Sequence, residues 1–174
     1  MAPLVRRTIA PRGQTPKLGQ KSGTREKVSV AAAFWISPGR DRWGLFSRTL
    51  VNGYFDTWYS ALFVEALLKQ LTGPVIVVWD GGSIHKGDPF RELEKVFAGR
   101  LILERLPPYA PELNPVEFVW SWLKYSRLNN FAPRDAAQLN QRIVAELAAI
   151  QGDQALLRSF VHASRLPLRL TLLS

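Results

Sequence analysis

A continuous apolar run at residues 74–79 (PVIVVW) limits the possible folds more than any other feature of the sequence. The run has the length of a β-strand, follows Gly73 and ends at Asp80. Uninterrupted apolar strands are typical of a sheet that helices cover on both faces. Helical patterns precede and follow the run, at residues 56–71 and 89–97. The sequence therefore predicts an α/β domain with this strand inside its sheet.

The rest of the chain extends this alternation within one domain, which a length of 174 residues suits. Residues 28–36 and 43–50 read as two strands of a hairpin, because the turn sequence SPGRD separates them. Residues 101–106 form a further strand, and helices are expected at 115–128, 133–150 and 153–164. The expected buried faces are Trp58, Leu62, Phe63, Ala66 and Leu67 in the first helix, and Leu139, Ile143, Leu147 and Ile150 in the helix at 133–150.

Positive charge is concentrated at the N-terminal end. The net charge is +9, and residues 1–27 hold seven Lys or Arg against a single acid, Glu26. Gly and Pro residues are frequent in the same stretch, which favours an arm or an irregular loop. A basic segment of this kind favours a polyanionic partner such as nucleic acid, and the alternative is a solvated surface that is merely basic.

Several protein classes are excluded or disfavoured. The chain has no cysteine, so disulfides and thiolate metal sites are excluded. Its longest apolar run is too short to cross a bilayer, and no apolar segment follows the early arginines as in a secretory signal. We therefore expect a cytoplasmic protein without a membrane partner.

Two acidic residues occupy positions that suit catalysis. Asp80 ends the apolar strand, and ligands of open α/β sheets bind at the carboxyl ends of strands. Glu117 lies in the first turn of the helix that Asn114 and Pro115 open, and that helix could pack back beside the strand. Two nearby carboxylates repel each other unless a cation lies between them, and Mg²⁺ or Mn²⁺ prefers such oxygen ligands. Two such ions can activate water and stabilise the leaving oxygen in phosphodiester cleavage.

Each acid also has a structural interpretation, which is the better one for either residue taken alone. Asp80 and Gly81 read as an ordinary turn after a strand. Glu117 stands three residues after Asn114, where it would complete a capping box. The choice depends on the longer segments in which the two acids lie.

Those segments closely resemble the bacterial insertion-sequence transposases of the mariner-related superfamily. The first is VWDGGSIHK at residues 78–86. The second is LPPYAPELNPVE at residues 106–117, followed by Val119, Trp120 and Lys124, and a motif of this length is highly specific. Residues 6–16 (RRTIAPRGQTP) are similar to the family's connector between its first and second strands. The resemblance covers nearly the whole chain.

The resemblance implies a ribonuclease-H-like mixed sheet flanked by helices, with catalytic acids on two adjacent strands and on a helix. It implies Asp80 and Glu117 as the second and third catalytic acids and as ligands of Mg²⁺ or Mn²⁺. The chain would comprise a basic connector at 1–27, a catalytic core at 28–128 and C-terminal helices at 129–174. The implied activity is DNA strand cleavage and strand transfer at the nucleoid, with DNA and a second copy or an intact transposase as partners. The residues expected to contact DNA are Arg6, Arg7, Arg12, Lys17, His85, Lys86 and Lys124.

Two positions depart from the family pattern. The family's first catalytic Asp lies on the central strand before the connector, but residues 1–27 contain no Asp. We therefore expect a sheet without its central strand and an incomplete catalytic site. The second departure is Gly81, which stands where the family usually has Asn.

Three alternatives to a working transposase stay open. The first is a remnant that binds DNA or intact transposase without cutting. The second is a chain whose missing strand is supplied by an upstream reading frame. The third is another ribonuclease-H-like nuclease. Individual residues also have competing roles. His85 is either a loop residue or a substrate contact, Lys86 is a solvated side chain or a phosphate ligand, and Trp120 and Trp122 are expected in the core or an interface.

Overall fold

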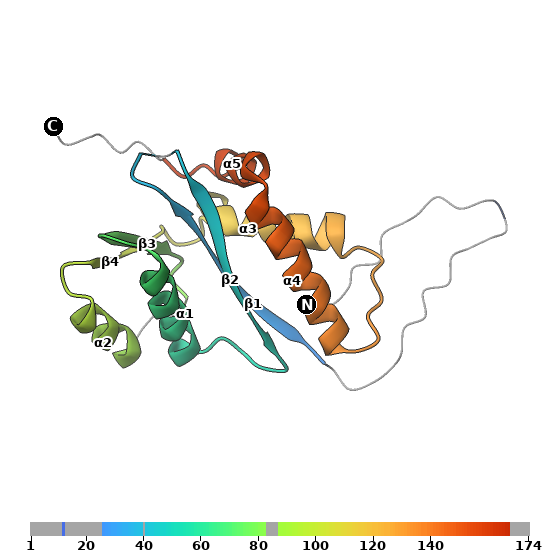
Figure 1. Cartoon of the computed structure of the whole chain (residues 1–174), viewed down its shortest axis with the longest axis horizontal. Helices are drawn as coiled ribbons and strands as arrows, with labels where there is room; N and C mark the ends of the chain where they lie inside the picture. The colour runs from blue at the N-terminus through green and yellow to red at the C-terminus, as the bar shows by residue number, and fades with distance from the viewer. Residues whose placement is uncertain (1–11, 13–25, 40, 83–86, 168–174) are drawn as a thin grey trace.

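The computed structural model describes residues 12, 26–39, 41–82 and 87–167. Every expected strand and helix is present, and each observed boundary lies within a few residues of its expected position (Figure 1). Beyond the expected elements, a short 3-10 helix precedes α3 and a π-helical segment continues it. The elements are β1 (Val28–Ile36), β2 (Trp43–Val51), α1 (Thr57–Gln70), β3 (Val75–Trp79), α2 (Asp88–Val96), β4 (Leu101–Arg105), η2 (Pro111–Leu113), α3 (Pro115–Trp122), η3 (Leu123–Arg127), α4 (Ala136–Gly152) and α5 (Gln154–Ala163).

The four strands form two separate sheets. β1 and β2 pair antiparallel as the expected hairpin, closed by a turn in which the Ser37 amide donates to the Arg42 carbonyl at 3.0 Å. β3 and β4 pair in parallel, with Val75 opposite Leu101 and Trp79 opposite Arg105. Within the described residues, each of the four strands, β1 and β3 included, therefore keeps one edge that pairs with no strand. This arrangement fits the expectation of a mixed sheet without a central strand.

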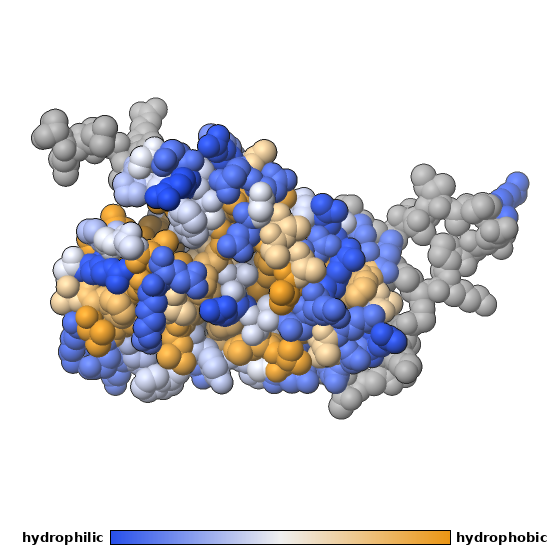
Figure 2. All heavy atoms as spheres, viewed as in Figure 1, coloured by the Kyte–Doolittle hydropathy of each residue, from blue (hydrophilic) through white to orange (hydrophobic). Residues whose placement is uncertain are grey.

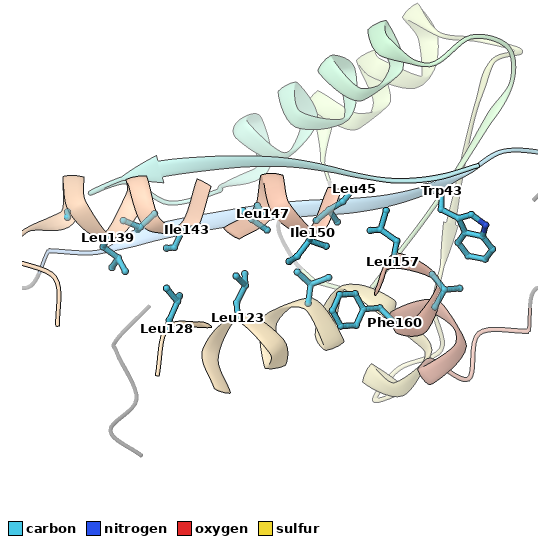
Figure 3. Packing of buried hydrophobic residues seen from close by; sticks show 14 residues of the cluster. Trp43, Leu45, Leu123, Leu128, Leu139, Ile143, Leu147, Ile150, Leu157 and Phe160 are labelled. Atoms are coloured by element: carbon cyan, nitrogen blue, oxygen red, sulfur yellow. The ribbon is translucent and has the colours of Figure 1, made fainter. Parts of the chain in front are cut away.

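One hydrophobic cluster holds the hairpin, α3, α4 and α5 together, and we call this part the hairpin half. The apolar face of α4 lies along the hairpin, as expected, and α3 and α5 close the cluster from the other side (Figure 3). Ile143, Ile150, Val119, Leu123 and Leu157 are fully buried there. This packing fixes the direction of α3, the helix that carries Glu117.

A second cluster joins α1, α2, β3 and β4, and we call this part the parallel half. α1 also reaches the hairpin half, because the rings of Phe63 in α1 and Phe46 in β2 lie 5.0 Å apart. In Figure 3, α1 and the cluster of α3, α4 and α5 lie on opposite sides of the hairpin. α1 is therefore a direct link between the two halves, on the side away from α3.

The buried face of α1 differs from the expected one. Asp56 caps the helix as predicted, its carboxylate accepting from the Tyr59 amide at 2.9 Å. Leu67 is buried as expected, but Trp58 and Leu62 are 68% and 55% exposed. Apolar residues occur around most of this helix, so its sequence pattern does not select one face. Apolar atoms accordingly reach the surface around α1 (Figure 2), and the residues buried instead are Ser60, Ala61, Val64 and Leu68.

The expectation that helices cover both faces of β3 is also wrong. The side chains of Val75, Val77 and Trp79 pack against the cluster of the parallel half. Ile76 and Val78 point the other way and are 56% and 47% exposed. A strand's own sequence shows that both its faces are apolar, but the covering layer is contributed by other segments.

Arg100, at the turn between α2 and β4, ties the parallel half together. Its guanidinium donates to the carbonyls of Leu68 and Leu71 at the end of α1, and to the Gly73 carbonyl at 2.9 Å. Its own carbonyl accepts from the Val75 amide at 2.7 Å, where β3 begins. One residue therefore satisfies helix-end carbonyls and positions the start of β3.

Replacing Arg100 by alanine should destabilise the fold. Charge-assisted hydrogen bonds to partly buried carbonyls contribute about 1.5–3 kcal/mol, so we expect a loss of about 2–3 kcal/mol in the free energy of unfolding. Urea unfolding monitored by tryptophan fluorescence measures the shift in midpoint. Arg91→Ala is the matched control, because Arg91 makes only an exposed ion pair with Asp88 and should change stability by less than about 0.5 kcal/mol. Equal losses in the two variants would contradict the role of Arg100.

Candidate active site

Asp80 lies at the edge of the parallel sheet where both strands end. The Leu106 amide donates to the Trp79 carbonyl at 2.8 Å, so the pairing of β3 and β4 continues to their carboxyl ends. The Asp80 side chain is exposed, and one of its oxygens accepts from the Gly82 amide at 2.9 Å. This hydrogen bond is the turn interaction expected from the structural interpretation. It holds the Asp80 carboxylate at the turn that follows β3.

The loop that precedes Glu117 turns tightly. Tyr109 adopts a positive φ of 58°, and the amide of Leu113 in η2 donates to the Ala110 carbonyl at 3.1 Å. α3 then begins at Pro115, with the Asn114 side chain accepting from the Val116 amide at 3.1 Å. The cap and the proline at the first helical position were both expected from the sequence.

The capping-box interpretation of Glu117 is not what the structure shows. The Asn114 amide, which a capping-box glutamate would accept from, donates instead to the Pro111 carbonyl at 3.0 Å. Glu117 is exposed, and its carboxylate makes no hydrogen bond or ion pair with a described residue. Local structure therefore does not require an acid at this position, which favours the functional interpretation.

The direction of Glu117 follows from the packing of α3. Val119 is fully buried against the hairpin half, and Glu117 lies two residues earlier, about 200° around the helix. Glu117 therefore points away from the core. α3 packs on the side of the hairpin opposite α1, and the exposed face of β3 is likewise the one turned away from α1. Both acids thus belong to exposed positions outside the two hydrophobic clusters.

The other predicted contact residues have mixed outcomes. Trp120 and Trp122 are half-buried against the cluster of the hairpin half, as expected, and Arg127 stacks 4.5 Å from the Trp122 ring. Lys124 is half-buried in the π-helical segment η3, and its contact with DNA stays a prediction. Arg12 is exposed. Arg6, Arg7, Lys17, His85 and Lys86 lie outside the described residues.

Two cations near this edge were not anticipated from the sequence. Arg105 is the last residue of β4 and stands opposite Trp79 in the register, one residue before Asp80. The amide of Arg165, from the chain beyond α5, donates to the Glu112 carbonyl at 2.8 Å. Both side chains are exposed. The position of Arg105 at the end of an apolar strand was a usable signal, whereas nothing in the sequence links Arg165 to residue 112.

The donor chemistry of the two acids fits a hard divalent cation. Each ends in carboxylate oxygens, is exposed and lies beside no cysteine or histidine ligand in the described residues. Among those residues, no group of three or more acidic, histidine or cysteine side chains gathers as a ready metal site. Asp80 and Glu117 therefore supply at most part of a coordination sphere.

Comparisons with known proteins agree with this reading of the fold. The family model described as DDE superfamily endonuclease matches residues 2–140. A solved structure, the crystal structure of the Mos1 strand transfer complex, superposes with a TM-score of 0.61 at 15% sequence identity. The match covers 92% of this chain and 46% of that chain, so this chain spans about half the length of its structural relative. No curated protein matches the chain significantly.

The fold is of the ribonuclease-H-like class. The chain belongs to the DDE superfamily endonucleases, whose family model covers most of its length. Nucleases of this superfamily generally use divalent metal ions. Across the described part of the chain, no helix is both long and apolar enough to cross a membrane.

The two acids are predicted to lie close enough to share one divalent ion, directly or through water. Asp80→Asn and Glu117→Gln should then each weaken Mn²⁺ binding about tenfold or more, as measured by titration with paramagnetic resonance detection. Glu112→Gln is the matched control, because Glu112 is an exposed acid in the same loop and should leave the affinity unchanged. A crystal structure of the Mn²⁺ complex with the two acids on opposite sides of the sheet would contradict the prediction.

Proposed function

We propose that this chain is the catalytic domain of a transposase of the bacterial insertion-sequence type, which cleaves DNA and transfers the freed strand. The observation that carries the proposal is the exposed Glu117 carboxylate, which pairs with no described residue and is presented by the LPPYAPELNPVE motif. The membership in the DDE superfamily and the strand-end position of Asp80 support it. Nicking of supercoiled plasmid DNA in the presence of Mg²⁺ tests the proposal directly.

The residues near the strand ends have complementary tasks in this proposal. Asp80 and Glu117 hold Mg²⁺ or Mn²⁺, which when bound activates water and neutralises charge on the phosphate that is cleaved. Arg105 ends β4 at the same edge of the sheet, opposite Trp79, and adds positive charge near that edge for a DNA strand. The turn hydrogen bond from Gly82 orients the Asp80 carboxylate before substrate arrives. The protein thus supplies mainly positioning and charge, as in-line attack at phosphorus requires.

A chain that binds DNA or an intact transposase without cutting is the second candidate. The observation that favours it is the separation of the strands into two sheets, with β1 and β3 each lacking a partner on one edge within the described residues. Open strand edges are places where another chain can pair. In either case we place the protein in the cytoplasm at the nucleoid, with DNA as the substrate or ligand and a second copy or an intact transposase as a further partner.

The basic N-terminal segment is expected to provide sequence-independent DNA affinity. Deleting residues 1–25 removes Arg6, Arg7, Arg12, Lys17, Lys21 and Arg25 but leaves Glu26, which accepts from the Ala136 amide at the start of α4. If all six contact phosphates, the slope of log K against log salt should flatten by up to about 5, at about 0.9 for each contact. Fluorescence anisotropy with a labelled duplex at several salt concentrations measures the slope.

A control for general charge loss comes from α2. Arg91 and Lys95 already pair with Asp88 and Glu92, so replacing both by glutamine should leave the slope unchanged. A deletion variant with the same slope as the full chain would show that residues 1–25 do not bind DNA.

A further inference from the structure

Tyr109, in the loop between β4 and α3, is fully exposed and has a strained backbone. Its exposed fraction is 102%, so its ring is as open to solvent as in an unfolded chain. Its φ of 58° is a left-handed conformation that a bulky side chain rarely adopts. The other non-glycine residues with a positive φ in the described part of the chain are Asn52 and Asn130, and asparagine tolerates this conformation. Neither packing nor the turn therefore accounts for a tyrosine at position 109.

The loop that carries Tyr109 is held stiffly on both sides. Two prolines at 107–108 restrict the backbone before it. The 3-10 helix η2 begins two residues after it, at Pro111, and the Glu112 carbonyl in η2 accepts from the Arg165 amide at 2.8 Å. A side chain on a stiff loop loses little conformational freedom when it binds a ligand, so the loop is suited to presenting the ring to a partner.

The same loop places Tyr109 at the edge of the sheet that carries the candidate site. The Leu106 amide pairs with the last residue of β3, immediately before Asp80. Tyr109 follows Leu106 by three residues, so their Cα atoms lie within about 11 Å of each other. The loop then leads into the helix whose first turn holds Glu117, and the exposed Arg105 adds positive charge at this edge. A DNA strand held at the two acids would pass beside the tyrosine ring.

We propose that the Tyr109 ring stacks on an unpaired nucleobase next to the phosphate that the candidate site holds. This inference rests on the proposed function, because it takes a DNA strand at the two acids. Aromatic side chains bind the faces of bases without regard to sequence. A base offers its face only when it leaves the helical stack, so the ring favours gapped or distorted DNA over an intact duplex. Tyr109 is thus a positioning residue, and the strained φ keeps its ring clear of the loop.

The affinities of the 174-residue chain for two labelled DNA duplexes, one intact and one with a short single-stranded gap, test the proposal by fluorescence anisotropy. Tyr109→Gly should weaken binding to the gapped duplex about tenfold and binding to the intact duplex less than about twofold. Tyr109→Phe keeps the ring and should bind both duplexes like the parent. A 2-aminopurine base in the gap should be quenched by the parent and by Tyr109→Phe, but not by Tyr109→Gly.

The glycine variant also separates binding from folding. Glycine adopts a positive φ without strain, so the urea midpoint of Tyr109→Gly should be no lower than that of the parent. A lower midpoint would show that the ring stabilises the loop and would overturn the proposal, as would unchanged affinity for the gapped duplex. Tyr125→Ala is the matched control, because Tyr125 is another exposed tyrosine but lies in η3, beyond the far end of α3. It should change neither affinity by more than about twofold.

The outcomes distinguish this proposal from the proposed function. A chain whose affinity for gapped DNA depends on Tyr109 but which never nicks DNA would contradict the proposed function and support the stacking role. A chain that nicks DNA while Tyr109→Gly binds the gapped duplex like the parent would do the reverse. If Tyr109→Gly instead converts a dimer into a monomer in analytical ultracentrifugation, the ring faces a second copy and the stacking proposal is wrong.

Discussion

Adding a strand with an aspartate in front of residue 1 is expected to raise Mg²⁺-dependent nicking of supercoiled DNA by at least about 100-fold. In the described residues, β1 and β3 each have an unpaired edge, and the two candidate acids make up only part of a metal site. A strand that pairs with both edges would join the two sheets and bring a third carboxylate beside Asp80. The added sequence can be taken from the first strand of a family relative.

The matched control carries the same added strand with asparagine in place of its aspartate. It should restore the sheet, raise thermal stability as much as the aspartate version does, and leave nicking at the level of the 174-residue chain. This comparison separates a structural effect of the strand from a catalytic effect of its acid. Robust nicking by the 174-residue chain that Asp80→Ala abolishes would show that the site is complete without the added acid.

Within the version that carries the added strand, Asp80→Asn and Glu117→Gln should each lower nicking by at least about 100-fold, because a displaced or lost ligand misplaces the reacting groups. Both substitutions keep the side-chain shape and remove only the charge. DNA affinity, measured by anisotropy, should change little, because phosphate binding depends mainly on Lys and Arg.

Glu112→Gln and Asp88→Asn serve as controls, since both acids are exposed and neither is placed at the candidate site. Their nicking rates should equal that of the parent. A Glu117→Gln variant as active as the parent would show that Glu117 is an ordinary exposed residue of α3. The assignment of the third acid would then be wrong even if the chain cuts DNA.

Helix and strand positions could be predicted because local residues determine them. Asp56 and Asn114 cap their helices through their own side chains, and Gly73 adopts the positive φ of 79° expected after a helix. Asp135 and Asp153 act in the same way for α4 and α5. Because Asp135 caps α4, the helix begins at Ala136 and ends at Gly152, two to three residues later than the expected range of 133–150.

Which faces are buried could not be predicted, because burial depends on distant segments. Trp58 and Leu62 have larger side chains than Ala61 and Val64, yet the smaller residues are buried and the larger ones face water. The run at β3 shows the same limit, since its second apolar face is exposed at Ile76. The apolar content of a strand or helix alone does not predict which other segment will cover that element.

The motifs predict which acids form the candidate site, but they do not predict the local environment of those acids. The alternative role of Glu117 as a capping residue depended on which carbonyl accepts from the Asn114 amide, and that is set by the tight turn at η2. Arg165 reaches the same loop through a main-chain contact that leaves no mark in the sequence. Such contacts between segments far apart in the chain require the structure.

The link through α1 gives the molecule a mechanical property. Asp80 belongs to the parallel half and Glu117 to the hairpin half, and the described strands of the two halves share no main-chain pairing. Side-chain packing, such as that of Phe63 on Phe46, and the loop that leads from β4 to α3 therefore connect the parts that carry the two carboxylates. Such packing yields more readily to a small hinge displacement than a hydrogen-bonded sheet does. A cation held by both acids would join the two halves, so that cation binding would also restrict their relative motion.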